Sequence, residues 1–411
     1  MLNRSFTLFW CARVASMAAT QMLMVAVGWQ IYAITSSAFD LGMVGLISFI
    51  PQVLLVLVTG QVADHFDRQR VTCICQMIEC VVVAILALGS FAGWLTRNDI
   101  YGLVLFFGTA RAFETPTLQT MLPSLVSADV LPRAISLSAA AMQTAIILGP
   151  AMGGWIYVLG AHIVYGTSAT LFVIAAILVS QIEQVQAPQI LRERPSFSTV
   201  FAGIGFIRQN PVVLGAISLD LFAVLLGGAT ALLPIYARDI LHTGAWGLGI
   251  LRSAPAVGAL LMSFWLSKFP INRHTGKKLF LGVASFGTAT IVFAMSGNFL
   301  LTSAALLVLG AADMVSVVIR GALVQLETPD EMRGRVNAVN SLFIGTSNQL
   351  GEFESGITAA WLGTVPAVLL GGAGTIIVAT LWMRLFPELL ARDQLQEKPD
   401  KTGTYKSISS Q

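Results

Sequence analysis

The sequence predicts an all-α membrane protein with twelve transmembrane helices in two pseudo-symmetric six-helix bundles. Of its 411 residues, 55% are hydrophobic and only 11% are charged, and the mean hydropathy is +0.77. A soluble protein of this size carries about a quarter charged residues. The missing charge is replaced by repeated apolar runs of about 20 residues, the length at which a helix crosses a bilayer.

Twelve such runs follow one another along the chain. We place them at 8–34, 41–62, 71–94, 101–122, 134–160, 163–183, 212–236, 246–267, 279–297, 299–323, 336–362 and 366–386. The one long connection, 184–211, mixes charge with proline and is predicted to be a cytoplasmic linker. It separates an N-terminal bundle (1–183) from a C-terminal bundle (212–386), and the polar tail 387–411 is expected to be disordered in the cytoplasm.

The two halves are related by a nearly constant offset. One shift places Gly45 on Gly249, and a shift shorter by two residues places Gly154 on Gly356. Six helices per half is an even number, so both halves enter the membrane in the same direction. Parallel repeats of this kind are found in secondary transporters.

Basic residues indicate how the protein is oriented. With the N-terminus inside, most of the 24 Lys and Arg fall in cytoplasmic segments, and only Arg97 and Arg238 fall outside. Cytoplasmic loops of membrane proteins carry an excess of Lys and Arg. Both termini are therefore expected in the cytoplasm.

Three short motifs stand out beside the apolar runs. They are GQVADHFDRQR (60–70), RAFET (111–115) and AIILGPAMGG (145–154). Together they resemble the signatures of the major facilitator superfamily, whose members are secondary transporters. The stretches ARVASMAATQMLMVAVGWQIYAIT and TPDEMRGRVNAV further resemble siderophore and drug exporters of the enterobactin-exporter type. This resemblance covers essentially the whole chain and implies the inner membrane of a bacterium.

The resemblance also implies roles for particular residues. The expected conformational latch is Gly60, Asp64, Arg68 and Arg70. The expected hinge of the antiporter type is Gly149, Pro150, Gly153 and Gly154. Asp67 and Ala145 replace glycines that are usual in these motifs. The alternatives are a plain charged turn for the first motif and close helix packing through small residues for the second.

Charged residues inside the predicted spans are the main functional signal. They are Arg13, Glu79, Arg111, Glu114, Asp220, Arg252, Asp313, Arg320, Glu352 and Glu354. An unpaired charge at a helix centre costs roughly 2.5–3.5 kcal/mol in a bilayer. These side chains are therefore expected to face a wet cavity or one another. Arg111 and Glu114 are one helical turn apart and should pair, and a pair between Arg13 and Asp220 is possible.

The stretch LGEFESG (350–356) places two glutamates in one apolar span. At 100° per residue, Glu352 falls on a face of small and polar residues near Asn348, whereas Glu354 flanks the apolar face. We predict that Glu352 faces a cavity and takes part in proton coupling. The candidate proton-coupling residues are Glu352, Asp313, Glu114 and Arg111. The candidate substrate-binding residues are Arg13, Arg111, Asn348 and Glu352.

These observations predict a secondary active transporter that exports a small organic molecule by proton antiport with alternating access. The resemblance favours a siderophore as substrate. A multidrug or macrolide-type efflux pump, a symporter, a lipid flippase and a non-transporting membrane sensor remain open. The expected partners are the substrate, protons and the lipid bilayer, with no nucleic acid, and the protein is expected to be a monomer.

An enzymatic activity, a cofactor or a metal site is not expected. The sequence contains no nucleotide-binding GxxxxGK[ST] loop, so transport driven by ATP bound to this chain is not indicated. Cys73 and Cys75 have no second pair of ligands nearby, as a zinc site would require. The proton gradient is the expected energy source.

Overall fold

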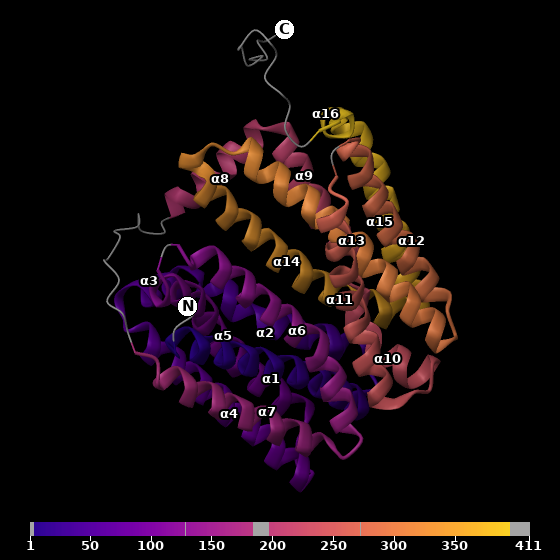
Figure 1. Ribbon diagram of the computed structural model, residues 1–411. Coiled ribbons are helices and arrows are strands. Elements are labelled where there is room, and N and C mark those ends of the chain that lie inside the picture. The colour runs from indigo at the N-terminus through magenta and orange to yellow at the C-terminus, as the bar shows by residue number, and fades with distance from the viewer. Residues whose placement is uncertain (1–3, 128, 184–196, 272, 395–411) are drawn as a thin grey trace.

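The computed structural model describes residues 4–127, 129–183, 197–271 and 273–394, and these residues form helices joined by short connections (Figure 1). In chain order the helices are α1 (Arg4–Thr35), α2 (Ala38–Leu54), α3 (Val56–His65), α4 (Arg68–Ala92), α5 (Arg97–Leu125), α6 (Leu131–Tyr157), α7 (Ala161–Ser180), α8 (Phe197–Gln209), α9 (Pro211–Leu226), α10 (Leu233–Ile235), α11 (Gly244–Lys268), α12 (Thr275–Met295), α13 (Phe299–Glu327), α14 (Asp330–Leu362), α15 (Thr364–Leu385) and α16 (Pro387–Ala391). A 3-10 turn, η1 (Ala229–Leu232), and a π turn, η2 (Tyr236–Ile240), lie on either side of α10.

Nine helical segments of the described chain are long and apolar enough to cross a membrane. The three other predicted spans correspond to α2 with α3, to α5 and to α14. The span predicted at 41–62 is divided at Leu55, one turn after Pro51, so neither piece reaches full length. Helices α5 and α14 are long enough, but their charged residues lower their hydropathy. The predicted all-α membrane fold is confirmed, and the count of twelve spans stays a prediction.

Short polar caps explain where several of these helices begin. The Asn210 side chain accepts hydrogen bonds from two backbone N–H groups at the start of α9, both at 3.1 Å. Asn298 does the same for α13, and Thr96 with Asp99 forms a capping box at α5. Such caps satisfy N–H groups that have no partner inside the helix. These helix starts are therefore set by the local sequence.

The helices pack as two bundles with the same internal arrangement. In the first bundle α4 packs on α5 and α7, and in the second bundle α12 packs on α13 and α15. The two bundles contact each other chiefly where α2 crosses α14 and where α6 crosses α11. The predicted linker contains a helix, α8, which packs on α14, so part of this segment is attached to the second bundle.

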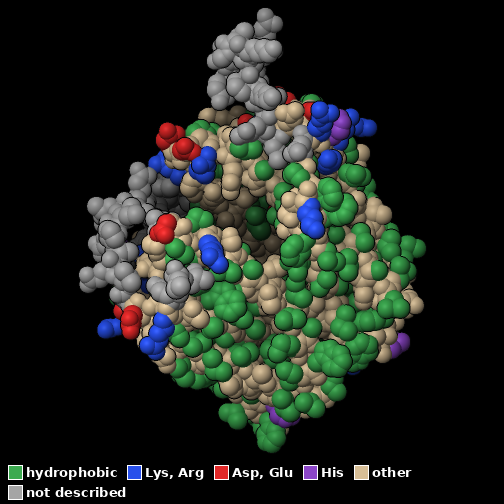
Figure 2. Space-filling view, in the orientation of Figure 1, with side chains coloured by type: hydrophobic (Ala, Val, Ile, Leu, Met, Phe, Trp, Pro, Cys, Tyr) green, Lys and Arg blue, Asp and Glu red, His purple; other side chains and the backbone are tan. Residues whose placement is uncertain are grey.

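The bundles meet at one end of the molecule and separate at the other. We call the end where α7 ends and α8 begins the linker end, and the other the opposite end. The largest hydrophobic cluster contains residues of both bundles, such as Val27 and Leu248, and reaches the opposite end. The three clusters at the linker end each lie within one bundle. Figure 2 shows a recess between the halves on the side where charged side chains gather.

Basic side chains are distributed unevenly between these two ends. Among the described residues, those at the linker end are Arg4, Arg68, Arg70, Arg133, Arg208, Lys268, Arg273, Lys277, Lys278, Arg333, Arg335, Arg384 and Arg392, and those at the opposite end are Arg97 and Arg238. The loops that the sequence assigns to one side of the membrane thus lie together in space. The recess opens at the basic end.

Candidate functional site

Two glycine-rich helix crossings join the bundles. At the first, Gly154 of α6 faces Gly249 of α11 so closely that an added Cβ would lie 2.8 Å from the Gly249 Cα. At the second, a Cβ on Gly356 of α14 would lie 2.8 Å from the Gly42 Cα on α2. Because Gly154 and Gly356 are repeat-equivalent, the two crossings are related by the pseudo-symmetry. Only glycine permits these approaches without displacing backbone.

The hinge residues predicted in α6 serve two different contacts. Gly149 and Gly153 pack within the first bundle, because a Cβ on them would meet Gln21 and Met22 of α1 at 2.6 and 2.9 Å. Gly154 packs across the bundle boundary. The motif therefore fixes α6 against α1 on one side and against α11 on the other.

The LGEFESG stretch lies at the second crossing. Gly351 packs on the end of α9, where a Cβ would lie 2.8 Å from the Val224 carbonyl oxygen. Glu352 projects toward α2, where its Oε2 would lie 2.7 Å from a Cβ on Gly45. It is partly buried and lies within electrostatic reach of Arg252, which donates to the Met24 carbonyl oxygen of α1 at 3.1 Å. Glu352 is thus part of the seam between the bundles.

The two glutamates of this stretch have different surroundings, as the helical geometry predicts. Glu354 accepts a hydrogen bond from Thr358 of the same helix at 2.8 Å. Asn348 is exposed and donates to the Ile344 carbonyl oxygen at 2.9 Å. It continues a stripe of exposed polar side chains on α14 that includes Asn337 and Ser341. Polar side chains exposed on a membrane-spanning helix are expected to face a wet cavity.

A buried cluster of charged groups occupies the first bundle. The predicted ion pair between Arg111 and Glu114 is present. Glu114 is fully buried, and its Oε1 also accepts hydrogen bonds from Ser16 of α1 at 2.8 Å and Gln76 of α4 at 3.0 Å. Three helices therefore hold this one carboxylate.

Arg13 and Glu79 complete the surroundings of this cluster. Arg13 donates to the Ser138 hydroxyl at 2.7 Å and interacts electrostatically with Glu114 and Arg111. Glu79 is fully buried beside Glu114. The sequence marked both residues as charges inside the membrane but did not indicate that they gather around Glu114.

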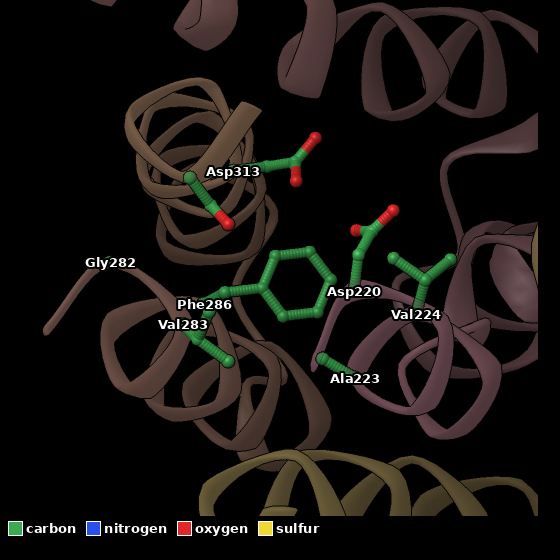
Figure 3. A pocket seen from close by; sticks show the side chains of 8 residues that line it. Asp220, Ala223, Val224, Gly282, Val283, Phe286 and Asp313 are labelled. Atoms are coloured by element: carbon green, nitrogen blue, oxygen red, sulfur yellow. The ribbon is translucent and has the colours of Figure 1, made fainter. Parts of the chain in front are cut away.

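The second bundle contains a comparable cluster around a small pocket (Figure 3). Asp220 of α9 forms a buried ion pair with Arg320 of α13, and the Arg320 Nε donates to the Ser316 hydroxyl at 3.0 Å. Asp313 lines the same pocket, and Figure 3 shows the Asp313 and Asp220 carboxylates on the same side of the Phe286 ring. The pocket volume is about 10 Å³, roughly what one water molecule needs.

This arrangement corrects one predicted pair. Arg13 and Asp220 lie in different bundles, and Asp220 is paired with Arg320 instead. Repeat positions share neither sign nor partner: Asp313 is equivalent by sequence to Arg111, which pairs with Glu114. The contacts of Arg13 and Asp220 join helices about 100 residues apart in the chain, and helical spacing carries no signal for them.

The predicted latch is only partly described. The Asp64 side chain lies outside the described residues. Arg68 donates to the Thr120 carbonyl oxygen of α5 at 3.1 Å, and Arg70 lies 3.5 Å from Asp67. Asp67 also caps α4 by accepting from the Gln69 N–H at 2.9 Å, which explains an aspartate where glycine is usual. A latch between the bundles stays a prediction.

A further contact joins the bundles at the opposite end. The Tyr32 hydroxyl of α1 donates to the Asp239 carboxylate of η2. Arg238 donates to the Tyr32 carbonyl oxygen at 3.2 Å, and its guanidinium lies 5.4 Å from the centre of the Tyr32 ring. We call these three residues the clasp. Two of its residues, Arg238 and Asp239, lie on the π turn η2, and π turns are frequent at functional sites.

Replacing Tyr32 by phenylalanine is expected to loosen the opposite end. The hydrogen bond joins the buried Tyr32 to the half-exposed Asp239 carboxylate. Its loss costs about 1 kcal/mol, which changes the ratio of two conformations about fivefold. Probes are placed on α1 and α11 where these helices reach the opposite end of the molecule. The distance between these probes should lengthen. Tyr236→Phe is the matched control, because its hydroxyl donates to Ala294 within one bundle. Equal distances in both variants would contradict the clasp.

The described residues hold no group of three or more His, Cys, Asp or Glu arranged to bind a metal ion. All ten intramembrane charges are buried or partly buried, so none faces lipid fully. They gather in two intrabundle clusters and in the seam around Glu352.

Two related bundles, a recess between them at one end and buried charges on the facing helices define a transporter of the major facilitator type. The chain belongs to the transmembrane secretion effector family, whose sequence model matches residues 1–404. The resemblance noted from the motifs is therefore confirmed.

Similar proteins of known sequence and structure agree with this class. The chain is 24% identical to the enterobactin exporter EntS of Citrobacter koseri, over 96% of this chain and 95% of that protein. It is also 24% identical to the enterobactin exporter EntS of Escherichia coli, over 97% of this chain and 95% of that protein. In structure it resembles a bacterial homologue of the human lysosomal transporter Spinster in an inward-facing conformation, with a TM-score of 0.73, 11% identity and coverage of 94% and 95%. It also resembles a bacterial homologue of the iron transporter ferroportin in an inward-facing state, with a TM-score of 0.70, 15% identity and coverage of 95% of this chain and 100% of that chain.

Proposed function

We propose that this protein exports a siderophore-like small organic molecule from the bacterial cytoplasm by proton antiport with alternating access. The observation that carries the proposal is the match to enterobactin exporters over nearly the whole of both chains. The fold adds a recess between two bundles, which is where secondary transporters bind their substrates. The protein would act in the inner membrane as a monomer, with no cofactor besides the proton gradient.

The position of the recess would let a cytoplasmic substrate enter. It opens at the basic end, which the positive-inside rule assigns to the cytoplasm. The exposed polar stripe of α14, with Asn348 at its inner end, would offer hydrogen bonds to a substrate that enters there. Arg13, partly exposed and bound to a neutral hydroxyl, would offer a positive charge.

Alternating access would follow from the two glycine crossings. Helix pairs that touch through glycine have few side chains to disengage when the bundles rock. Rocking that separates these crossings would close the linker end and part the clasp at the opposite end. Glu352, which is in the seam in this conformation, would then be exposed to the outside, where protons are taken up.

The test is substrate-triggered proton flux in proteoliposomes with an imposed proton gradient. Catecholate and hydroxamate siderophores and cationic drugs are added in turn, and internal pH is recorded. We expect flux with a siderophore, and we expect Glu352→Gln to lose it. Glu354→Gln is the matched control, because Glu354 binds within its own helix.

Each outcome bears on a different part of the proposal. Flux only with cationic drugs would replace the siderophore by the multidrug alternative. Labelled substrate that crosses without proton flux would exclude antiport while export stands. Proton flux in the same direction as substrate movement would indicate symport.

A further inference from the structure

Helix α4 has a lipid face and a polar inner face. The exposed apolar residues along its middle recur at helical spacing and are Ile74, Met77, Ile78, Val81, Ile85 and Leu88. The other face buries Thr72, Gln76 and Glu79, each with 0% of its surface exposed. Glu79 therefore points into the first bundle, away from lipid.

Glu79 and Glu114 are neighbours with opposite environments. Glu114 is an ion-pair partner of Arg111 and accepts two further hydrogen bonds, from Ser16 and Gln76. No N–H or O–H group of the described residues donates to either carboxyl oxygen of Glu79, and the group within hydrogen-bonding reach of them is the Glu114 carboxyl group. A buried ionised carboxylate without a partner is far more costly than a neutral one. The pair thus holds one carboxylate with an ion-pair partner and two hydrogen-bond donors, and one carboxyl group that has to share that ion-pair partner.

The titratable groups in and around this carboxyl pair come from three helices. Helix α5 contributes Arg111 and Glu114, and α1 contributes Arg13, whose nearest charges are those two residues. Helix α4 itself contributes the Cys75 thiol. Helix α7 also packs on α4, and its two titratable residues lie near the opposite end of the molecule. One guanidinium, that of Arg111, directly faces two carboxyl groups.

We propose that Glu79 and Glu114 form a carboxyl pair that carries one transported proton, with Arg111 as the counter-ion of the ionised member. Two carboxyl groups that share one positive partner in a buried site cannot both ionise readily. This inference rests on the proposed proton antiport and adds a residue, Glu79, to its machinery. The site lies beside the predicted substrate residues Arg13 and Arg111.

The proton step follows from this geometry. With the proton bound, Glu79 is a neutral acid and Glu114 remains paired with Arg111. On release of the proton to water, the O–H bond of Glu79 breaks and its electron pair stays on the carboxylate, so two carboxylates share Arg111. A substrate group that donates hydrogen bonds to the pair would stabilise this state in place of the proton. Proton and substrate would then exclude each other, as antiport requires.

The proposal can be tested without knowing the substrate. Infrared spectra of the purified full-length protein at neutral pH should contain the carbonyl band of a protonated carboxylic acid. The band should be absent in Glu79→Gln, present in Glu354→Gln and displaced in Glu79→Asp. An unchanged band in Glu79→Gln would overturn the assignment, and Glu79→Asp provides the test if the glutamine variant does not fold.

Transport assays separate this inference from the proposed function. Counterflow of labelled siderophore needs no net proton movement, and its dependence on pH should be present in the wild-type protein and lost in Glu79→Gln. Proton-driven accumulation should fall more than tenfold. Wild-type protein without counterflow would contradict the proposed function, whereas the infrared result would still decide the carboxyl pair. Normal proton-driven accumulation in Glu79→Gln would overturn the inference alone.

Discussion

Replacing Arg320 by methionine is expected to lower the free energy of unfolding by about 3–5 kcal/mol. The change removes the guanidinium that neutralises Asp220 and leaves that carboxylate buried with 8% of its surface exposed. The neighbouring carboxylate of Asp313 would add repulsion. Denaturant titration of the protein in detergent micelles would measure the loss.

Two further variants define what this loss means. Asp220→Asn combined with Arg320→Met should recover most of the stability, because no uncompensated charge remains. Arg13→Met is the matched control, since Arg13 binds the neutral hydroxyl of Ser138. Equal losses of unfolding free energy in Arg13→Met and Arg320→Met would show that breaking the buried ion pair costs no more than breaking a hydrogen bond to a neutral hydroxyl.

Replacing Gly154 by valine is expected to drive the protein out of the conformation described here. A Cβ at this position would lie 2.5 Å from the Ala245 carbonyl oxygen and 2.8 Å from the Gly249 Cα, both backbone atoms. Overpacking of this kind costs roughly 1–3 kcal/mol, and the cost falls only on conformations in which α6 and α11 touch. The population with an open linker end should therefore fall roughly five- to a hundredfold.

Distances between probes at the linker ends of α3 and α14 would report this shift, together with a loss of transport. Gly166→Val in α7 is the matched control, because a Cβ there meets nothing within 4 Å. An unchanged distance distribution in Gly154→Val would mean that the crossing does not set the conformational balance.

The parts of this protein that the sequence predicted well depend on local rules. The apolar runs predicted the membrane fold because backbone N–H and C=O groups find no hydrogen-bond partners in lipid, and a helix pairs them within one segment. The Arg111–Glu114 pair followed from a spacing of one turn. Glu352 and Glu354 were assigned to different faces because a helix turns 100° per residue, and the structure places one in the seam and the other in a contact within α14.

The errors and omissions concern contacts between helices. Asp220 was considered as a partner for Arg13, yet it pairs with Arg320, because α9 and α13 are neighbours in one bundle. Glu79 was recognised only as a charge in a membrane span. Its position beside Glu114 and Arg111 depends on which side chains α5 brings to the same level, and a single sequence carries no record of that.

By itself the sequence determined the helices, their relation by a repeat, the uneven distribution of basic residues and the presence of ten charges that lipid cannot accept. These depend on composition and on the period of the helix, which act within a few residues. Only the tertiary structure decided which charges meet, which glycines allow the bundles to touch and at which end the recess opens. Those features depend on how helices far apart in the chain pack, and at each crossing the space left by the neighbouring backbone decides which side chains fit.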